Sequence, residues 1–160
     1  MAMQNRTDRF LAGFILVGFS AALAIADPSH PEVPNDALTP GAVASTNQHE
    51  VCAFGGSETY SQRHRITPVE LKGWIFREYG MQPPQGAERR DWEIDHLVPL
   101  CLGGADEAAN LWPQHRSSYR RKDALEAYGC REVCRGATPL AEAQSWFLGD
   151  WRKEMWRVGL

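Results

Sequence analysis

The sequence lacks the excess of basic residues that is typical of nucleic-acid-binding domains. It contains 17 Lys and Arg against 20 Asp and Glu, which gives a formal net charge of −3 at pH 7. Removal of residues 1–26, which is predicted below, makes this charge one unit more negative, because the stretch holds two arginines and one aspartate. A generally basic surface is therefore excluded, and any contact with a polyanion needs a local cluster of Lys and Arg.

The N-terminal apolar run is too short for a comfortable membrane span. It extends from Phe10 to Ala24, whereas a spanning helix needs ~20 apolar residues. Arg6 and Arg9 precede it, and the small residues Ala24 and Ala26 follow in a cleavage-site pattern. A permanent membrane anchor is the alternative. We predict a signal peptide over 1–26 and an exported protein, periplasmic or secreted, with no stable membrane association after cleavage.

The chain has no Cys-x2-Cys pair, which disfavours a structural zinc site. Its four cysteines are Cys52, Cys101, Cys130 and Cys134. An even number in an exported domain favours disulfides, because compartments outside the cytosol are oxidising. Four cysteines allow three pairings, and the sequence leaves the choice open.

Internal repeats and low-complexity tracts are also missing, so we predict one domain over residues 49–160. Residues 27–48 are rich in Pro, Ser, Asn and Asp and are interpreted as an extended arm or linker. "EVCAF", starting at Glu50, is typical of a short strand that ends at Gly55-Gly56.

Three helices are predicted around the centre of the chain. The first spans 67–80, where Thr67, Pro68 and Glu70 form a capping pattern. The second runs from Arg116 to about Tyr128. The third starts at Pro139, and Gly149 is a candidate interruption of it. The tryptophans are interpreted as core residues, because helix-spaced aromatics in a small domain are more often packed than free to stack on bases.

The segment from Trp92 to Gln114, "WEIDHLVPLCLGGADEAANLWPQ", is the most informative part of the chain. Its two β-prone pieces flank Gly103-Gly104, and the helix at 116 follows. The order is therefore strand, turn, strand, helix, and the predicted fold class is α+β. Neighbours on a regular strand point to opposite faces, so Asp95 and His96 serve one site only if the strand ends there, which Pro99 favours.

Asp95 and His96 combine two groups that suit phosphodiester hydrolysis. An aspartate is a hard oxygen ligand for Mg²⁺-like ions, and a histidine is the natural general base at neutral pH. A base activates water while an ion neutralises the phosphate. An Asp-His dipeptide alone is common on protein surfaces, so the surrounding pattern has to decide.

The surrounding pattern resembles HNH endonucleases, the ββα-metal nucleases. In the small exported bacterial members of that family, the motif region commonly reads close to DH-x-x-P-L-x-LGG, then NLWPQ, then KD-x-x-E. This chain has "DHLVPLCLGG" at 95–104, "NLWPQ" at 110–114 and "KDALE" at 122–126. The "VC" at 133–134, "AEAQ" at 141–144 and "DW" at 150–151 resemble the family's tail, so the likeness covers roughly residues 40–160.

The resemblance implies a ββα-metal core braced by additional helices and a short N-terminal strand. Asp95 is then expected to bind one divalent metal ion, Mg²⁺ or alternatively Mn²⁺, Ni²⁺ or Zn²⁺. His96 is expected to be the general base, and Asn110 to hold the loop that aims it. The family's further metal ligand, a His or Asn on the helix, has no clear counterpart here. His115 is the expected substitute, with Ser118 or water as alternatives.

Phosphate contacts are expected from the basic stretch "HRSSYRRK" at 115–122, chiefly from Arg116, Arg120 and Lys122. Arg116 and Arg120 are four residues apart and share a helix face. Arg63, His64 and Arg65 form a second, weaker candidate. Nothing in either cluster indicates base reading, so the expected activity is cleavage of DNA, or alternatively RNA, with little sequence specificity.

Two other functions remain open. A non-catalytic exported module that binds metal or a polyanion on the same fold is the main alternative, because the helix ligand is uncertain. A glycosidase that uses Glu93 and Asp95 as a carboxylate pair is a weaker one. Glu93 shares a strand face with Asp95 and could support a metal ligand or be merely exposed. The oligomeric state and the biological role are left open by the sequence.

Overall fold

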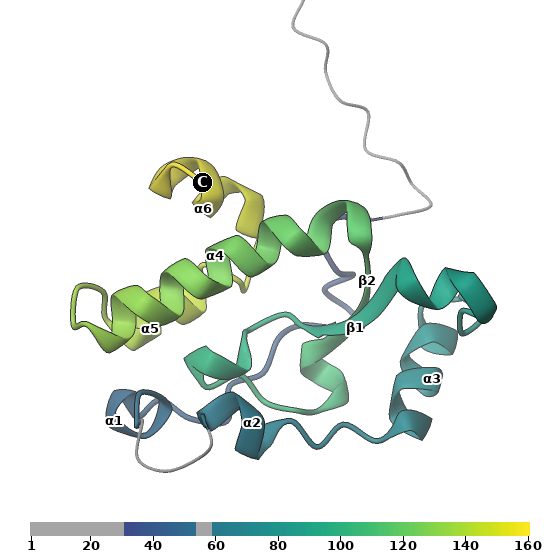
Figure 1. Cartoon of the computed structure of the whole chain (residues 1–160), viewed down its shortest axis with the longest axis horizontal. Coiled ribbons are helices and arrows are strands. Elements are labelled where there is room, and N and C mark those ends of the chain that lie inside the picture. Colours follow the sequence, from purple (N-terminus) through teal and green to yellow (C-terminus); the bar gives the residue numbers. More distant parts are fainter. Residues whose placement is uncertain (1–30, 54–58) are drawn as a thin grey trace, which may run out of the picture.

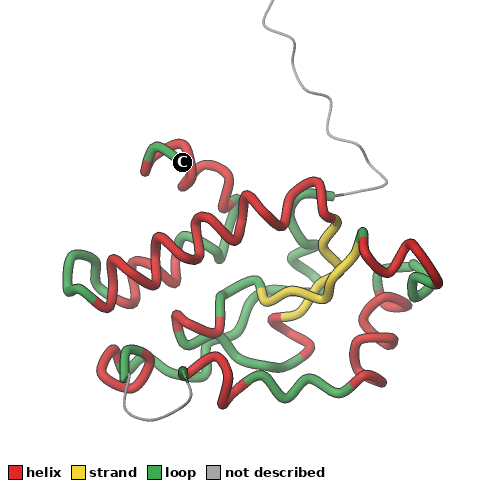
Figure 2. Tube along the Cα trace, in the orientation of Figure 1, coloured by secondary structure: helices red, strands yellow, loops and turns green. Residues whose placement is uncertain are grey.

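The structure is a computed structural model, and it describes residues 31–53 and 59–160. The predicted signal peptide and the Gly55-Gly56 turn lie outside these residues. Helices and one small sheet make up the described chain, which establishes a mixed α+β class (Figures 1 and 2). The elements are α1 (Gln48–Val51), α2 (Tyr60–His64), α3 (Val69–Glu78), η1 (Gly86–Arg90), β1 (Trp92–His96), η2 (Leu100–Leu102), η3 (Ala108–Asn110), β2 (Leu111–His115), α4 (Arg116–Cys134), α5 (Leu140–Ser145) and α6 (Trp151–Val158).

The sheet consists of β1 and β2, which pair in antiparallel register. Trp92 lies opposite His115, Asp95 opposite Trp112, and His96 opposite Leu111. Helix α4 starts at the residue that follows β2, so the predicted order of strand, turn, strand and helix is present. In Figure 1, α4 leads away from the sheet, α5 lies along its far half, and α6 lies beside its middle.

The main hydrophobic core lies between α4, the two C-terminal helices and the turn after β1. It is a continuous cluster of apolar side chains from all these elements: Val98, Leu102, Leu125, Val133, Leu140, Ala143, Trp146, Phe147, Trp151 and Met155. Trp112, Trp146 and Trp151 are buried, as predicted, whereas the prediction is wrong for Trp74 and Trp156, which are 43% and 81% exposed. Burial of these large side chains is the main stabilising contribution in a domain of this size.

Two disulfides confirm the predicted use of the cysteines. Cys52 pairs with Cys134, and Cys101 pairs with Cys130. Both bonds end on the last turns of α4, which extends to Cys134 rather than ending near Tyr128 as predicted. The disulfides are compatible with an exported protein.

The N-terminal strand predicted from "EVCAF" is wrong. Residues 48–51 form α1 instead, because the Asn47 side chain accepts hydrogen bonds from the backbone N–H groups of His49 and Glu50 and caps this turn. The β-prone Val51 is buried in the core as a helical residue. Tertiary packing and a local cap therefore outweigh the strand preference of this segment.

The predicted cap at Thr67 is also wrong. Helix α3 starts after Pro68 without a side-chain cap, because the Thr67 hydroxyl donates to the carboxylate of Asp106. A complete capping box occurs instead between Thr59 and Gln62 at the start of α2. At the C-terminus, the predicted interruption is confirmed, since α5 and α6 are separate helices on either side of Gly149.

The described part of the predicted arm packs against the turn between the strands. The N–H of Gly41 donates to the carbonyl of Ala109 at 2.9 Å, and the N–H groups of Ala44 and Ser45 donate to the carbonyl of Gly103 at 2.8 and 3.0 Å. A Cβ at Gly103 would overlap the Ser45 carbonyl, and Gly103 has a φ of 78°. A glycine is therefore required there for this close approach.

No helix among residues 31–53 and 59–160 has both the length and the apolar character needed to cross a lipid bilayer.

Replacing Cys52 and Cys134 together by Ala should lower the free energy of unfolding by ~2–5 kcal/mol, because this bond closes the longer of the two loops and restricts the unfolded chain. Urea denaturation of the oxidised proteins measures the change. The Cys101→Ala/Cys130→Ala pair is the matched comparison and should lose less. An unchanged midpoint in the first variant would show that the Cys52–Cys134 bond contributes nothing to stability.

Candidate active site

His96, at the end of β1, is held by Asp106 from the turn between the strands. The imidazole Nε2 lies 2.6 Å from Asp106 Oδ1, and the two side chains are only 4% and 6% exposed. Asp106 is itself fixed, because it accepts hydrogen bonds from the Ile66 N–H at 2.6 Å and from the Thr67 hydroxyl. The 65–67 segment therefore fastens the aspartate, and the aspartate fastens the histidine.

This arrangement sets the protonation of the ring. Burial raises the pKa of Asp106, but the hydrogen bonds from Thr67, His96 and Ile66 outweigh burial and hold it below its usual value. An ionised Asp106 accepts the proton on Nε2, which leaves Nδ1 as the basic nitrogen. Within the part of the chain that the structure describes, Nδ1 has no hydrogen-bond partner. Burial lowers the pKa of His96, against the raising effects of Asp106 and Asp95, so the ring is neutral at pH 7.

Asn110 fixes the backbone that carries His96. Its Oδ1 accepts from the Val98 N–H at 2.8 Å and from the Ala42 N–H at 3.3 Å. Its Nδ2 donates to the carbonyls of Val98 and Ala105 at 2.9 and 2.8 Å. The fully buried amide thus ties both ends of the turn and the N-terminal arm together.

Asp95 takes part in a buried ion-pair network centred on Lys122. The ammonium Nζ lies 2.6 Å from Asp95 Oδ2 and 2.6 Å from the backbone carbonyl of His96, and it also contacts Glu126. The Lys122 side chain is 0% exposed. Burial lowers the pKa of Lys122, but the charges of Asp95 and Glu126 outweigh burial and raise it, so the ammonium stays protonated. Lys122 is therefore not available to bind phosphate at the surface.

The described residues do not offer a ligand set for a divalent metal ion at Asp95. One oxygen of Asp95 is engaged by Lys122, and no group of three His, Cys, Asp or Glu side chains within residues 31–53 and 59–160 is arranged to hold a metal. The expected partner His115 lies opposite Trp92, at the other end of the strand pair from Asp95. Its Nδ1 accepts the N–H of Ser117 and caps α4.

Ser118, the alternative ligand, is also far from suitable. Its buried hydroxyl donates to the carbonyl of His115 and accepts from Gln114, both at 3.2 Å. The structure therefore brings Asp95, Lys122 and the main chain of His96 together, with Asn110 holding the turn that follows. His115 and Ser118 belong to the start of α4.

Glu93 lies on β1 beside this network and borders a hollow of about 450 Å³. We call it the Arg65 hollow; its charged and aromatic lining consists of Arg65, Lys72, Phe76, Arg89, Trp92 and Glu93. Burial and the neighbouring charges of Asp95 and Asp123 raise the pKa of Glu93 to about 7, although Lys122 and Arg65 oppose the shift. A carboxyl in this range can hold or release a proton at neutral pH.

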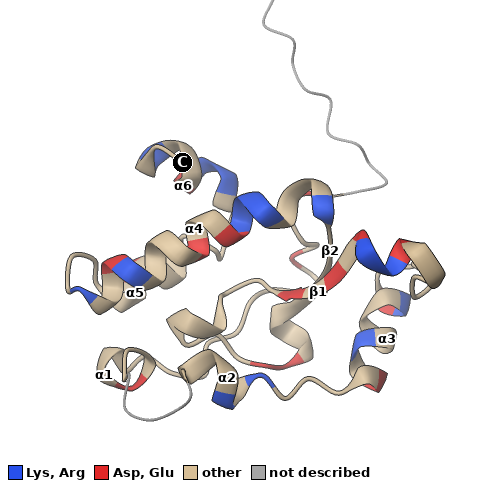
Figure 3. Ribbon diagram, viewed as in Figure 1, with Lys and Arg blue, Asp and Glu red and all other residues tan. Residues whose placement is uncertain are grey.

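A second basic hollow, of about 460 Å³, lies at the start of α4. This Arg116 hollow is lined by Arg90, Arg116, Tyr119 and Arg120. Arg116 is paired with Asp91 at 3.0 Å, but its side chain remains 62% exposed. Figure 3 shows acidic residues along β1 and basic residues on the first turns of α4. Arg116 and Arg120, which are predicted to bind phosphate, thus lie on one surface. Lys122, the third predicted residue, is buried and does not contribute to it.

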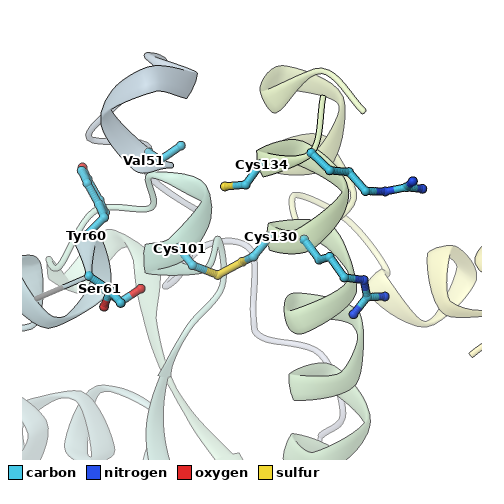
Figure 4. A pocket seen from close by; sticks show the side chains of 9 residues that line it. Val51, Tyr60, Ser61, Cys101, Cys130 and Cys134 are labelled. Atoms are coloured by element: carbon cyan, nitrogen blue, oxygen red, sulfur yellow. A yellow bond between two sulfur atoms is a disulfide. The ribbon is translucent and has the colours of Figure 1, made fainter. Parts of the chain in front are cut away.

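Another pocket, of about 480 Å³, lies beside the Cys101–Cys130 disulfide and away from the strands (Figure 4). Its lining is mostly apolar and includes Val51, Tyr60 and Cys134, with no residue of β1 or β2. It therefore plays no part in the chemistry of His96.

Sequence reasoning missed Asp106, although it is the residue that orients His96. Its position directly after the Gly103-Gly104-Ala105 turn is a usable signal, because a turn between paired strands returns the chain toward the residues that precede it. The sequence marks Arg65 only as part of the weaker basic cluster with Arg63 and His64. The hydrogen bonds of Ile66 and Thr67 to Asp106 bring this arginine to the site.

Comparison with protein-family models, curated proteins and solved structures finds no match to this chain.

Asn110→Ala should lower the free energy of unfolding by about 3 kcal/mol, because it leaves the N–H and C=O of Val98 and the C=O of Ala105 buried without partners. Chemical denaturation measures the loss. Asn47→Ala, which removes only the cap of the short α1, is the matched control and should cost about 1 kcal/mol. Equal losses in the two variants would contradict the central role of Asn110.

Glu93→Gln should change how stability depends on pH. A carboxyl whose pKa is raised on folding stabilises the folded state at low pH and loses that contribution as pH rises from its ordinary 4.5 through about 7. Gln has no proton to lose in this range. The stability of the variant relative to the wild type should therefore increase as pH rises across this window. Thermal melts at several pH values test this, and a pH-independent difference between the two proteins would refute it.

Proposed function

We propose that this chain hydrolyses phosphodiester bonds in nucleic acid, DNA or alternatively RNA, with little sequence preference and with His96 as the general base. The observation that carries the proposal is the Asp106–His96 pair. A carboxylate holds one nitrogen of a neutral, nearly buried imidazole at 2.6 Å, and the other nitrogen is left to accept a proton.

The local architecture supports an HNH-like identity for the site. Two antiparallel strands lead directly into α4, His96 ends the first strand, and a buried Asn110 fastens the connecting turn. This is the order of elements and the asparagine role that the resemblance to HNH endonucleases implies. The metal ion implied by the same resemblance enters no step below, since its ligand set does not fit.

The chemistry begins with water near Nδ1 of His96. As the water oxygen attacks phosphorus, Nδ1 takes its proton, and the ionised Asp106 stabilises the imidazolium that forms. The bond from phosphorus to the leaving oxygen breaks, and that oxygen needs a proton in return. We assign this proton to Glu93, because its pKa of about 7 keeps a large fraction protonated at neutral pH and because the charge of Arg65 acts on both Glu93 and His96.

Positive charge for the phosphate comes from arginines at the surface. Arg65 is exposed, and its charge lowers the pKa of both Glu93 and His96, so it lies near both groups. Arg116 and Arg120 offer further phosphate contacts at the other end of the strands. These contacts hold the backbone rather than the bases, which accounts for the low sequence preference.

The second candidate is a non-catalytic exported module that binds a polyanion. The specific observation in its favour is that His96 is only 3% exposed while the two basic hollows are open. Such a module would bind nucleic acid through the arginines and leave it intact.

His96→Ala should lower the rate of plasmid or oligonucleotide cleavage by roughly 10²- to 10⁴-fold, the usual contribution of a general base. Asp106→Asn should lower it by about 10- to 100-fold, because the ring then loses its fixed tautomer. His49→Ala, at an exposed position on α1, is the matched control and should be unaffected. Tight binding without cleavage by the wild type would favour the non-catalytic module.

The cleavage rate should fall on acidification with a midpoint below pH 6.5, the ordinary pKa of histidine. Burial and the charge of Arg65 favour the neutral ring, whereas Asp106 and Asp95 favour the charged ring. Burial is the largest of these effects, so the pKa of His96 is lowered. The active, neutral form therefore predominates at pH 7, and the rate falls as pH drops through the lowered pKa. A rate profile measured in buffers of constant ionic strength tests this, and a midpoint above 6.5 would contradict His96 as the base.

A further inference from the structure

We propose that the ammonium group of Lys122 is the built-in cation of this site, and that the site operates without a bound divalent metal ion. The part of this inference that concerns catalysis rests on the proposed function. The part that concerns cation binding is independent of it.

The first observation is that Lys122 uses its full donor capacity on the site. An ammonium group has three N–H donors. Its nitrogen lies 2.6 Å from Asp95 Oδ2, 2.6 Å from the His96 carbonyl, and in contact with Glu126 Oε1. The ring of Phe147 closes the remaining side, with its centroid 5.4 Å from Nζ. Two carboxylates, one carbonyl and a positive charge are thus already assembled.

The second observation is that removing or displacing the Lys122 ammonium group would have a high free-energy cost. Lys122 is completely buried, and removal of its charge would leave Asp95 and Glu126 facing each other without a counter-ion, which is strongly unfavourable. A divalent ion bound to the same carboxylates would lie within a few ångströms of the ammonium and be repelled by it. Lys122 and a metal ion are therefore alternatives at this position.

The third observation concerns His96. Lys122 binds the backbone carbonyl of the very residue whose side chain is held by Asp106. Helix α4 therefore fixes the main chain of His96 while the 65–67 segment fixes its ring through Asp106. Lys122 is a positioning residue for the base, and it neutralises part of the acidic charge of Asp95 and Glu126 behind it.

The cation-binding test uses the full oxidised chain and Mn²⁺ as the probe, with bound ion measured by electron paramagnetic resonance. The wild type is expected to bind no stoichiometric Mn²⁺ that depends on Asp95. One bound equivalent that disappears in Asp95→Asn would overturn the inference.

Lys122→Met supplies the complementary test, with Lys153→Met on α6 as the matched control for loss of an exposed lysine. Lys122→Met should lower the melting temperature and acquire stabilisation by Mn²⁺, whereas Lys153→Met should do neither. A folded Lys122→Met that responds to Mn²⁺ no more than the wild type would contradict the inference. If Lys122→Met does not fold, the wild-type titration with Asp95→Asn decides.

The catalytic test compares nucleic-acid cleavage in EDTA and in Mg²⁺. The wild type should cleave equally in both. His96-dependent cleavage that is lost in EDTA overturns this inference and leaves the proposed function standing. Absence of cleavage in every condition overturns the proposed function, and the Mn²⁺ experiments then decide the role of Lys122 alone.

Discussion

The rest of the site depends on one buried ammonium group, because Lys122 joins α4 to the end of β1. It binds Asp95, Glu126 and the main chain of His96 in a place that water does not reach. Removing one partner of a buried ion pair is far more costly than removing a surface one. The two carboxylates therefore keep a fixed geometry. The main chain of His96 is fixed with them, because Lys122 also binds its carbonyl.

The histidine is held from three directions. Lys122 holds its carbonyl, Asp106 holds its ring, and Asn110 holds the turn two residues later through Val98. Thr67 and Ile66 in turn hold Asp106. Such support by surrounding groups is what an active histidine requires, because a general base works only when its nitrogen is aimed correctly.

The sequence predicted the parts of this arrangement that depend on neighbours along the chain. The two strands, the turn at Gly103-Gly104, the start of α4 and the use of the cysteines follow from local patterns and are present. Contacts between distant segments could not be predicted in the same way. Thr67 looks like a helix cap locally but binds Asp106, and Lys122 sits in a basic run that suggests solvent but is buried by the fold.

The most direct measurement of the central claim is the tautomer and pKa of His96 by nitrogen NMR of the imidazole. The account predicts a proton on Nε2, a bare Nδ1 at pH 7 and a pKa below 6.5. A proton on Nδ1 in the neutral ring, or a pKa above 6.5, would contradict it, because the nitrogen meant to activate water would then be occupied.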